Sequence, residues 1–269
     1  MIGKLKLVLS NNYNFFKKGS LYLLLKKIKI LRKIKYVVAK SYGTVFPCQY
    51  KLHGDLILKT VFDLIGREIK ATSIIETGTY VGLSTSLMAT MFPDLKIYTC
   101  EINELNYRRA KKNLQKFLNV NLHKETSSKF LKRLIDRTLI GNKPLFFLDA
   151  HWLDEWPLED EIAIISNSRI SAVIIIDDFK IPGDDRFKYD KYGTKECSLD
   201  LIIPKLNKKN NYNVLFPNYG REIFNDKIYH PALSGYSIIF QNCEKDFKRI
   251  YKLDFMKKYF VNRSSLLNL

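Results

Sequence analysis

The chain has 269 residues, 46% of them hydrophobic and 13% aromatic, so it can bury a full core and lacks the composition of a disordered protein. Its four cysteines lie far apart and form no C-x-x-C pair. This argues against a zinc ribbon or a disulfide scaffold and suits a reducing compartment. No apolar run approaches the roughly 18–20 residues of a membrane-spanning helix, and the first residues show no signal-peptide pattern. We therefore expect a cytoplasmic protein.

The net charge of +18 is concentrated at the N-terminal end. Residues 1–42 hold ten lysines, one arginine and no acid, while the rest of the chain has 34 basic and 27 acidic residues. Residues 21–40 have the spacing of a helix with one apolar and one basic side. Such a helix suits the inner, anionic face of a membrane, or packing against its own domain or a second copy of the chain. The lysine-rich arm does not favour nucleic acid as a partner.

Beyond the arm, residues 43–54 have the composition of a linker, and residues 56–69 predict a helix. Apolar runs then alternate with helical segments, which is typical of a doubly wound α/β sheet. We expect strands at residues 73–77, 96–101, 120–124, 144–149, 172–177, 212–216 and 235–241. The prediction is a Rossmann-like, seven-stranded sheet with helices on both faces, whose last two strands form a hairpin-like pair. Residues 55–241 would form this domain and 242–269 a C-terminal extension, with residues 261–269 adding nothing recognisable.

The most informative motif joins the first strand to a helix predicted at residues 83–91. Glu76 and Gly78 end the strand, Gly82 precedes the helix, and Glu101 ends the next strand, 23 residues after Gly78. Glycines let a backbone approach a ligand, a helix start offers free N–H groups, and a carboxylate can accept both hydroxyls of a ribose. The spacing is G-x-x-x-G and not the dinucleotide G-x-G-x-x-G. The motif therefore indicates a nucleoside site, with a purely structural turn as the alternative.

Acidic residues also follow the fourth and fifth predicted strands. Asp149 and His151 come after the fourth, and Asp177 and Asp178 come after the fifth. Because parallel strands end at one edge of a sheet, these groups should converge there, where a hard divalent ion would relieve the repulsion. The alternative is two strand-end turns with capping carboxylates. A histidine titrates near neutral pH, so His151 could be a general base or could hydrogen-bond a metal ligand.

The strand–turn–helix motif and the acid after the next strand resemble class I S-adenosylmethionine-dependent methyltransferases. The resemblance implies S-adenosyl-L-methionine as the cofactor, with its ribose on Glu101 and its adenine near Ser127. The residues that it implies around the cofactor are Glu76, Gly78, Thr79, Gly82, Ser84, Glu101, Ser127 and Asp149. No Asp-Pro-Pro-Tyr sequence follows the fourth strand, which disfavours amino-methylation of nucleic acid.

The acids after the fourth and fifth strands resemble those of metal-dependent O-methyltransferases of the catechol, caffeoyl-coenzyme A and macrolide-sugar types. This implies a divalent metal, Mg²⁺ above others, held by Asp149, Asp177 and Asp178. Beside such an ion, the candidate catalytic residues are His151 and Asp149. The catechol enzymes have a lysine three residues after the first metal Asp, where this chain has Trp152, so the resemblance does not fix the base.

A block rich in Gly, Tyr and charge at residues 177–193, together with residues 154–161, resembles methyltransferase-like proteins of bacterial surface-polysaccharide synthesis. Aromatic rings beside carboxylates suit a sugar, and they equally suit an ordinary surface loop. We therefore expect an S-adenosylmethionine-dependent O-methyltransferase that acts on a sugar, a glycan or another hydroxylated small molecule. Two alternatives are a metal-dependent glycosyltransferase that uses a nucleotide sugar and a non-catalytic, membrane-associated protein with a methyltransferase-like core.

Overall fold

The structure, a computed structural model, describes residues 52, 54–150, 156–220, 223 and 233–267. All of these lie in one unit of the chain, Cys48–Leu269. The predicted basic arm (residues 1–42), most of the predicted linker, and His151 with Trp152 lie outside the described residues. The proposed roles of the arm and of His151 therefore stay predictions.

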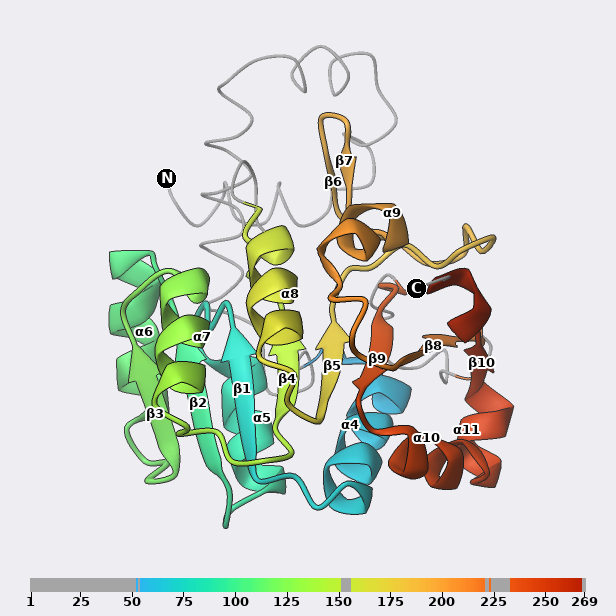
Figure 1. Cartoon of the computed structure of the whole chain (residues 1–269). Coiled ribbons are helices and arrows are strands. Elements are labelled where there is room, and N and C mark those ends of the chain that lie inside the picture. The colour runs from blue at the N-terminus through green and yellow to red at the C-terminus, as the bar shows by residue number, and fades with distance from the viewer. Residues whose placement is uncertain (1–51, 53, 151–155, 221–222, 224–232, 268–269) are drawn as a thin grey trace, which may run out of the picture. The chain divides into compact units, whose positions relative to one another are not determined.

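An eight-stranded sheet forms the centre of this unit, in the order β10-β8-β9-β5-β4-β1-β2-β3 (Figure 1). The five parallel strands are β1 (Ser73–Thr77), β2 (Lys96–Cys100), β3 (Val120–His123), β4 (Leu145–Leu148) and β5 (Ala172–Ile176). Strands β1, β4 and β5 are buried along their whole length, which explains why each reads as an apolar run in the sequence.

Three antiparallel strands extend the sheet beyond β5. They are β9 (Ser237–Gln241), β8 (Tyr212–Pro217) and β10 (Phe260–Asn262). All seven predicted strands are present within two residues of their expected bounds, and β8 and β9 pair as expected. The α/β fold with a mainly parallel sheet is thus confirmed, and β10 adds an eighth strand that was not predicted.

Helices link the parallel strands, and right-handed crossovers place α5 and α6 on one face and α7 and α8 on the other. Figure 1 shows α7 and α8 side by side. The helices of this part of the fold are α4 (Leu56–Glu68), α5 (Leu83–Met91), α6 (Glu104–Leu114), α7 (Ser127–Asp136), α8 (Leu158–Asn167), α9 (Leu199–Ile202) and the 3₁₀ helix η2 (Ile203–Lys205). The helices predicted at residues 56–69 and 83–91 are therefore α4 and α5.

A buried cap ties the start of α4 to the antiparallel side of the sheet. The carboxylate of Asp55 accepts two backbone N–H groups from the first turn of α4. It also accepts the hydroxyl of Tyr219, 2.6 Å away, and that hydroxyl lies 3.0 Å from the hydroxyl of Tyr236. Tyr219 follows β8 and Tyr236 precedes β9, so one carboxylate joins three elements.

The C-terminal residues complete the sheet and the core. They form α10 (Glu244–Tyr251), α11 (Asp254–Tyr259), β10 and the 3₁₀ helix η4 (Ser264–Leu267). Leu267 is buried, and β10 pairs with β8. Residues 261–267 thus take part in the sheet and the core although their sequence shows no recognisable pattern, because burial and pairing order a segment whose local pattern is weak.

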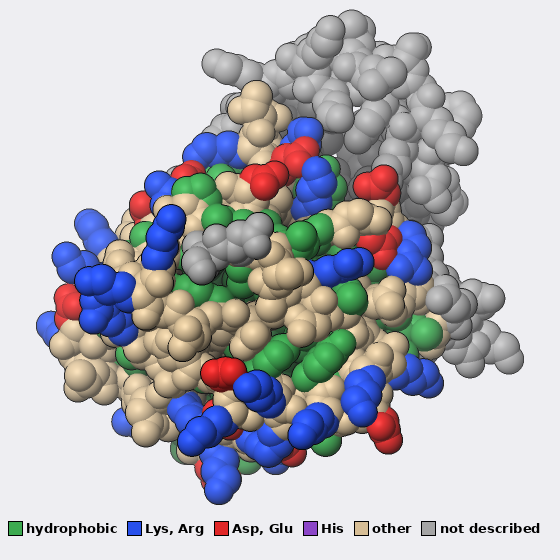
Figure 2. All heavy atoms as spheres, turned by 45° about the vertical axis from the view of Figure 1, so that its right-hand side comes forward, with side chains coloured by type: hydrophobic (Ala, Val, Ile, Leu, Met, Phe, Trp, Pro, Cys, Tyr) green, Lys and Arg blue, Asp and Glu red, His purple; other side chains and the backbone are tan. Residues whose placement is uncertain are grey.

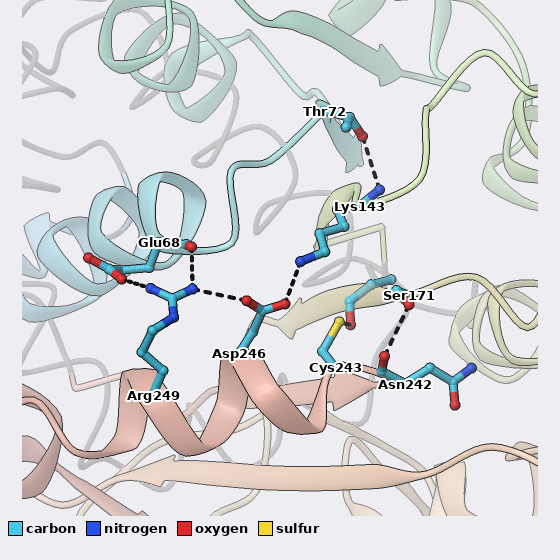
Figure 3. A network of polar contacts seen from close by, with 9 residues as sticks. Glu68, Thr72, Lys143, Ser171, Asn242, Cys243, Asp246 and Arg249 are labelled. Carbon is cyan, nitrogen blue, oxygen red and sulfur yellow. Dashed lines mark hydrogen bonds and ion pairs between the residues drawn. The ribbon is translucent and has the colours of Figure 1, made fainter.

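An ion-pair network holds α10 against α4 and the chain before β4 (Figure 3). Arg249 of α10 pairs with Glu68 at the end of α4 and donates to its own neighbour Asp246 at 2.9 Å. Asp246 also accepts from Lys143, 2.7 Å away. These contacts fix the C-terminal helices on the amino-end side of the parallel strands, opposite the edge where the predicted site lies.

Opposite charges are mixed on the described surface. Figure 2 shows Lys and Arg side chains interspersed with Asp and Glu on one face. Pairs such as Lys195–Glu159 and Arg186–Asp184 join them. Among the residues that the structure describes, none of the helices combines the length and hydropathy that a bilayer span requires.

Candidate active site

The turn between β1 and α5 depends on two glycines in the left-handed conformation. Gly78 has a φ of +84°, and a Cβ there would lie 2.2 Å from the carbonyl oxygen of Asp149. Gly82 has a φ of +82°, and a Cβ there would lie 2.8 Å from the side chain of Leu114. The first glycine allows the chain after β1 to approach the chain after β4 closely, and the second allows α5 to start against the end of α6. Both glycines therefore have a structural role, and a ligand at this turn would meet backbone.

Glu101 follows β2 and faces this turn. Its Oε2 accepts the backbone N–H of Tyr80 at 2.8 Å, and its Oε1 accepts that of Asn103 at 2.7 Å. Burial raises the pKa of the carboxyl, and these backbone donors act against the rise. Each carboxylate oxygen has a second lone pair. The backbone N–H of Ile102 also acts on the carboxylate. The group is thus held in one orientation and can still accept a hydrogen bond from a ligand hydroxyl.

Glu76 and Ser84, both predicted to contact the cofactor, bind each other. Glu76 is fully buried in β1 and accepts the hydroxyls of Ser84, Thr85 and Thr99. Burial raises its pKa, and the three hydroxyls oppose the rise. The hydroxyl of Thr79 lies 2.6 Å from that of Thr99. In the described structure this network stabilises the turn by joining β1, β2 and the first turn of α5.

Ser127, the predicted adenine contact, begins α7 and is 6% exposed. Its hydroxyl faces the carboxyl of Glu161, a fully buried residue of α8 that was not predicted. Thr77, the last residue of β1, faces the same carboxyl. Burial raises the pKa of Glu161 to about 7 despite the two hydroxyls. Neither hydroxyl stands where it would make a hydrogen bond of regular geometry with the carboxyl.

The acids predicted to follow β4 and β5 lie at the carboxyl edge of the sheet. The buried thiol of Cys197 lies near these acids. Its pKa is raised well above its usual range, first by burial and then by the nearby carboxylates. These carboxylates belong to Asp178, Asp190, Asp177 and Asp149. Asp190 was not singled out in the sequence, since a lone acid in a loop carries no pattern. The three predicted acids and a fourth are thus close enough to Cys197 to raise the pKa of its thiol.

These acids are not arranged as a metal centre. Within the described ranges, no group of three or more His, Cys, Asp or Glu side chains is placed to hold a metal ion. Asp178 has a φ of +47°, and its carbonyl oxygen accepts the backbone N–H of Asp190 at 2.9 Å. The backbone of this turn is therefore fixed by the neighbouring loop. Metal binding by Asp149, Asp177 and Asp178 remains a prediction.

The block at residues 177–193 leads into a small hairpin, β6 (Lys191–Tyr192) and β7 (Lys195–Glu196). It stands beyond the carboxyl end of β5 (Figure 1). The backbone N–H of Lys180 donates to the carbonyl of Cys197 at 2.6 Å, and its ammonium pairs with Glu196. The Tyr192 ring meets Trp156 edge-on, with centroids 5.6 Å apart. Aromatic and acidic side chains thus border the same end of the sheet.

Comparisons with known proteins agree with this topology. Residues 29–167, more than half of the chain, match the family model described as O-methyltransferase. No curated protein matches the chain. It is similar to the O-methyltransferase TomG from Streptomyces achromogenes, involved in tomaymycin synthesis and solved with S-adenosylmethionine (17% identity, TM-score 0.47, covering 69% of this chain and 80% of that one).

A second similar structure is the O-methyltransferase from Bacillus cereus in complex with S-adenosylhomocysteine. It shares 19% identity at a TM-score of 0.45, covering 80% of this chain and 91% of that one. These likenesses are too distant to add to the argument, which rests on the family match and the strand order. The chain belongs to the O-methyltransferase family and is an S-adenosylmethionine-dependent methyltransferase.

Proposed function

We propose that the protein methylates a hydroxyl oxygen of a sugar or another hydroxylated small molecule, assisted by a divalent metal ion. One observation carries the proposal: the fixed carboxylate of Glu101 and the acids after β4 and β5 share one edge of the sheet. Glu101 suits the ribose of the cofactor, and the acids after β4 and β5 suit a hydroxylated acceptor. The family match leaves the glycosyltransferase alternative without support.

On the cofactor side, Glu101 would accept hydrogen bonds from the ribose hydroxyls. The backbone at Gly78 and Thr79 would lie against the cofactor, and Ser127 would lie near the adenine. Glu76 and Ser84 would act indirectly, because their hydrogen bond stabilises the turn that contacts the cofactor. This differs from the direct contact expected of them from the sequence.

The transfer itself is an in-line displacement. The acceptor oxygen attacks the methyl carbon, a C–O bond forms as the C–S bond breaks, and S-adenosylhomocysteine leaves. The hydroxyl proton passes to a base, for which His151 and Asp149 are the candidates. Carboxylates are the ligands that hard divalent cations prefer, so Asp149, Asp177 and Asp178 are the candidate ligands. The described structure does not place them as a formed metal site, so they would have to draw together to hold the ion. When bound, such an ion lowers the pKa of the acceptor hydroxyl and orients it.

A sugar acceptor is supported by the aromatic side chains beside the acids. Trp156 and Tyr192 pack together next to the hairpin, and Tyr189 lies under the ammonium of Lys180, 5.3 Å from the ring centroid. Aromatic rings present flat apolar faces, and neighbouring carboxylates accept sugar hydroxyls. The basic arm at residues 1–42 would bring the enzyme to glycan intermediates at an anionic membrane.

Calorimetric titration tests this proposal, with S-adenosylhomocysteine and UDP-sugars injected in parallel. We expect S-adenosylhomocysteine to bind and the UDP-sugars not to bind. The reverse result would support the glycosyltransferase alternative, and binding of neither would support a non-catalytic protein. Transfer of labelled methyl groups to monosaccharides and to catechols would then separate a sugar acceptor from an aromatic one.

A further inference from the structure

Three buried polar side chains from three different elements meet beneath the proposed cofactor site. They are Thr77 at the end of β1, Ser127 at the start of α7 and Glu161 in α8, which we call the Glu161 cluster. Thr77 and Glu161 are fully buried, and Ser127 is 6% exposed. In the described structure, none of their four side-chain oxygens has a hydrogen-bond partner of regular geometry. Four buried polar oxygens of this kind close together are unusual, because burial of a polar atom without a hydrogen bond destabilises the folded state.

The position of the cluster connects it to the cofactor turn. Thr77 directly precedes Gly78, and Ser127 is the first residue of the helix predicted to face the adenine. Cys100 of β2 pairs with Thr77 in the sheet register, and Glu161 contributes to the raised pKa of its thiol. The cluster therefore lies on the face covered by α7 and α8, directly under the strand ends that form the site.

The charge of Glu161 is not offset by an ion pair in the described part of the chain. Its neighbour Glu159, in the same helical turn, pairs with Lys195 and Lys205 at the surface. Glu161 instead faces two hydroxyls, with the thiol of Cys100 nearby and the carboxylate of Asp160 as an added repulsion. A neutral carboxyl can donate one hydrogen bond and accept another, whereas a carboxylate can only accept.

We propose that Glu161 is a positioning residue for the cofactor: its buried carboxyl faces both Thr77 and Ser127 and so fixes the distance between the end of β1 and the start of α7. The inference rests on the proposed S-adenosylmethionine site. The protonated carboxyl is neutral and fits this interior position beside two hydroxyls. Loss of the proton leaves a charge in the interior without an ion pair, so the two sides of the site are held less firmly.

Calorimetric titration with S-adenosylhomocysteine at about pH 6 and about pH 8, on either side of neutrality, tests this link. The variants are Glu161→Gln, which keeps the shape and cannot ionise, and Glu159→Gln, the same change in the same helical turn but outside the cluster. We expect the wild-type Kd to rise roughly fivefold over this range, the lower end of coupling between linked sites. Glu161→Gln should keep its affinity at both pH values, and Glu159→Gln should follow the wild type.

Equal pH dependence in the wild type and in Glu161→Gln would overturn the inference while leaving the cofactor site intact. Absence of binding by the wild type at both pH values would instead overturn the proposed function, and this inference with it. If Glu161→Gln does not fold, the wild type and Thr77→Val decide. A wild-type affinity that is unchanged over the range, or a Thr77→Val affinity equal to that of the wild type, would contradict the role.

Discussion

A Cβ atom at Gly78 would lie 2.2 Å from the carbonyl oxygen of Asp149, closer than any non-bonded contact allows. Both the Cβ position and the Asp149 carbonyl are fixed by the backbone, so no side-chain rotation relieves the contact. Gly78→Ala should therefore lower the free energy of unfolding by about 3 kcal/mol, from backbone strain and overpacking together. Denaturant unfolding measures the change. Gly183→Ala is the matched control, because its φ of +73° is similar and nothing lies within 4 Å. Equal losses in the two variants would contradict the close approach of Gly78 to Asp149 as the cause.

Removal of the Glu101 side chain should weaken cofactor binding. Glu101→Ala deletes a carboxylate that two backbone N–H groups hold in place, and the loss should be on the order of 1.5–3 kcal/mol. Calorimetry with S-adenosylhomocysteine gives the value, with circular dichroism to confirm folding. Glu104→Gln, a surface change three residues along that affects ion pairs with Arg108 and Lys124, should bind as the wild type does. Unchanged affinity in folded Glu101→Ala would reject the ribose assignment.

Metal dependence is tested by chelation. If Asp149, Asp177 and Asp178 hold a divalent ion, excess EDTA should abolish methyl transfer and leave S-adenosylhomocysteine affinity unchanged, and added Mg²⁺ should restore transfer. Asp177→Asn should reproduce the loss, whereas Asp184→Asn, which alters a surface pair with Arg186, should not. Full turnover in EDTA would exclude the metal and leave His151 as the principal chemical group.

The stability of the protein should fall as pH rises toward neutrality. Burial raises the pKa of Glu161 from 4.5 in an exposed glutamate to about 7 in the folded protein. The folded state therefore binds this proton more tightly than the unfolded state does. The contribution of this proton to the free energy of unfolding is fully present below about pH 4.5. It is lost as the pH rises through about 7, a change of roughly 3 kcal/mol.

Denaturant unfolding across this range should show the decline in the wild type and a smaller one in Glu161→Gln. Glu76 and Glu101 also have raised pKa values, so the variant should keep part of the slope. Superimposable pH profiles for the two proteins would contradict the assignment of this titration to Glu161.

The basic arm should bind anionic membranes. Residues 1–42 carry eleven basic and no acidic residues, and each lysine near an anionic surface contributes about 1 kcal/mol. Flotation of the full chain with anionic and with neutral liposomes, at low and high salt, measures the effect. A chain that lacks residues 1–42 is the control. If the full chain does not bind anionic liposomes at low salt, the arm serves packing or self-association. If binding persists without the arm, another surface of the protein binds the membrane.

The central elements could be predicted from the sequence because their local pattern and their burial agree. Strand β1 is five buried residues, and both its bounds and those of α5 match the prediction. Glu101 was also identifiable, since an acid that ends an apolar run at this distance from a glycine turn has few structural alternatives. Its backbone partners, by contrast, depend on the folded turn and on Tyr80 with its φ of +51°.

Other parts depend on contacts between residues far apart in the sequence. The hairpin at residues 191–196 contains charged and aromatic residues with no strand pattern, and it is anchored through Asp178 and Cys197. Glu161 was missed because three acids in the first turn of a helix look alike in a sequence. Only the packing of α8 turns Glu161 inward, while Glu159 stays at the surface.

The short strand β10 has a consequence for the solubility of the folded chain. Strand β8 is six residues long and mostly buried, and without β10 its outer edge would offer a row of unpaired backbone groups to another molecule. Exposed edges of this kind promote pairing between chains. Strand β10 covers part of that edge with only three residues. The next two residues satisfy the backbone of Val214, because Arg263 N–H donates to its carbonyl and Ser264 Oγ accepts from its N–H, and a 3₁₀ helix then ends this segment. The sheet therefore ends in a strand too short to recruit a neighbour, which guards the protein against edge-to-edge aggregation.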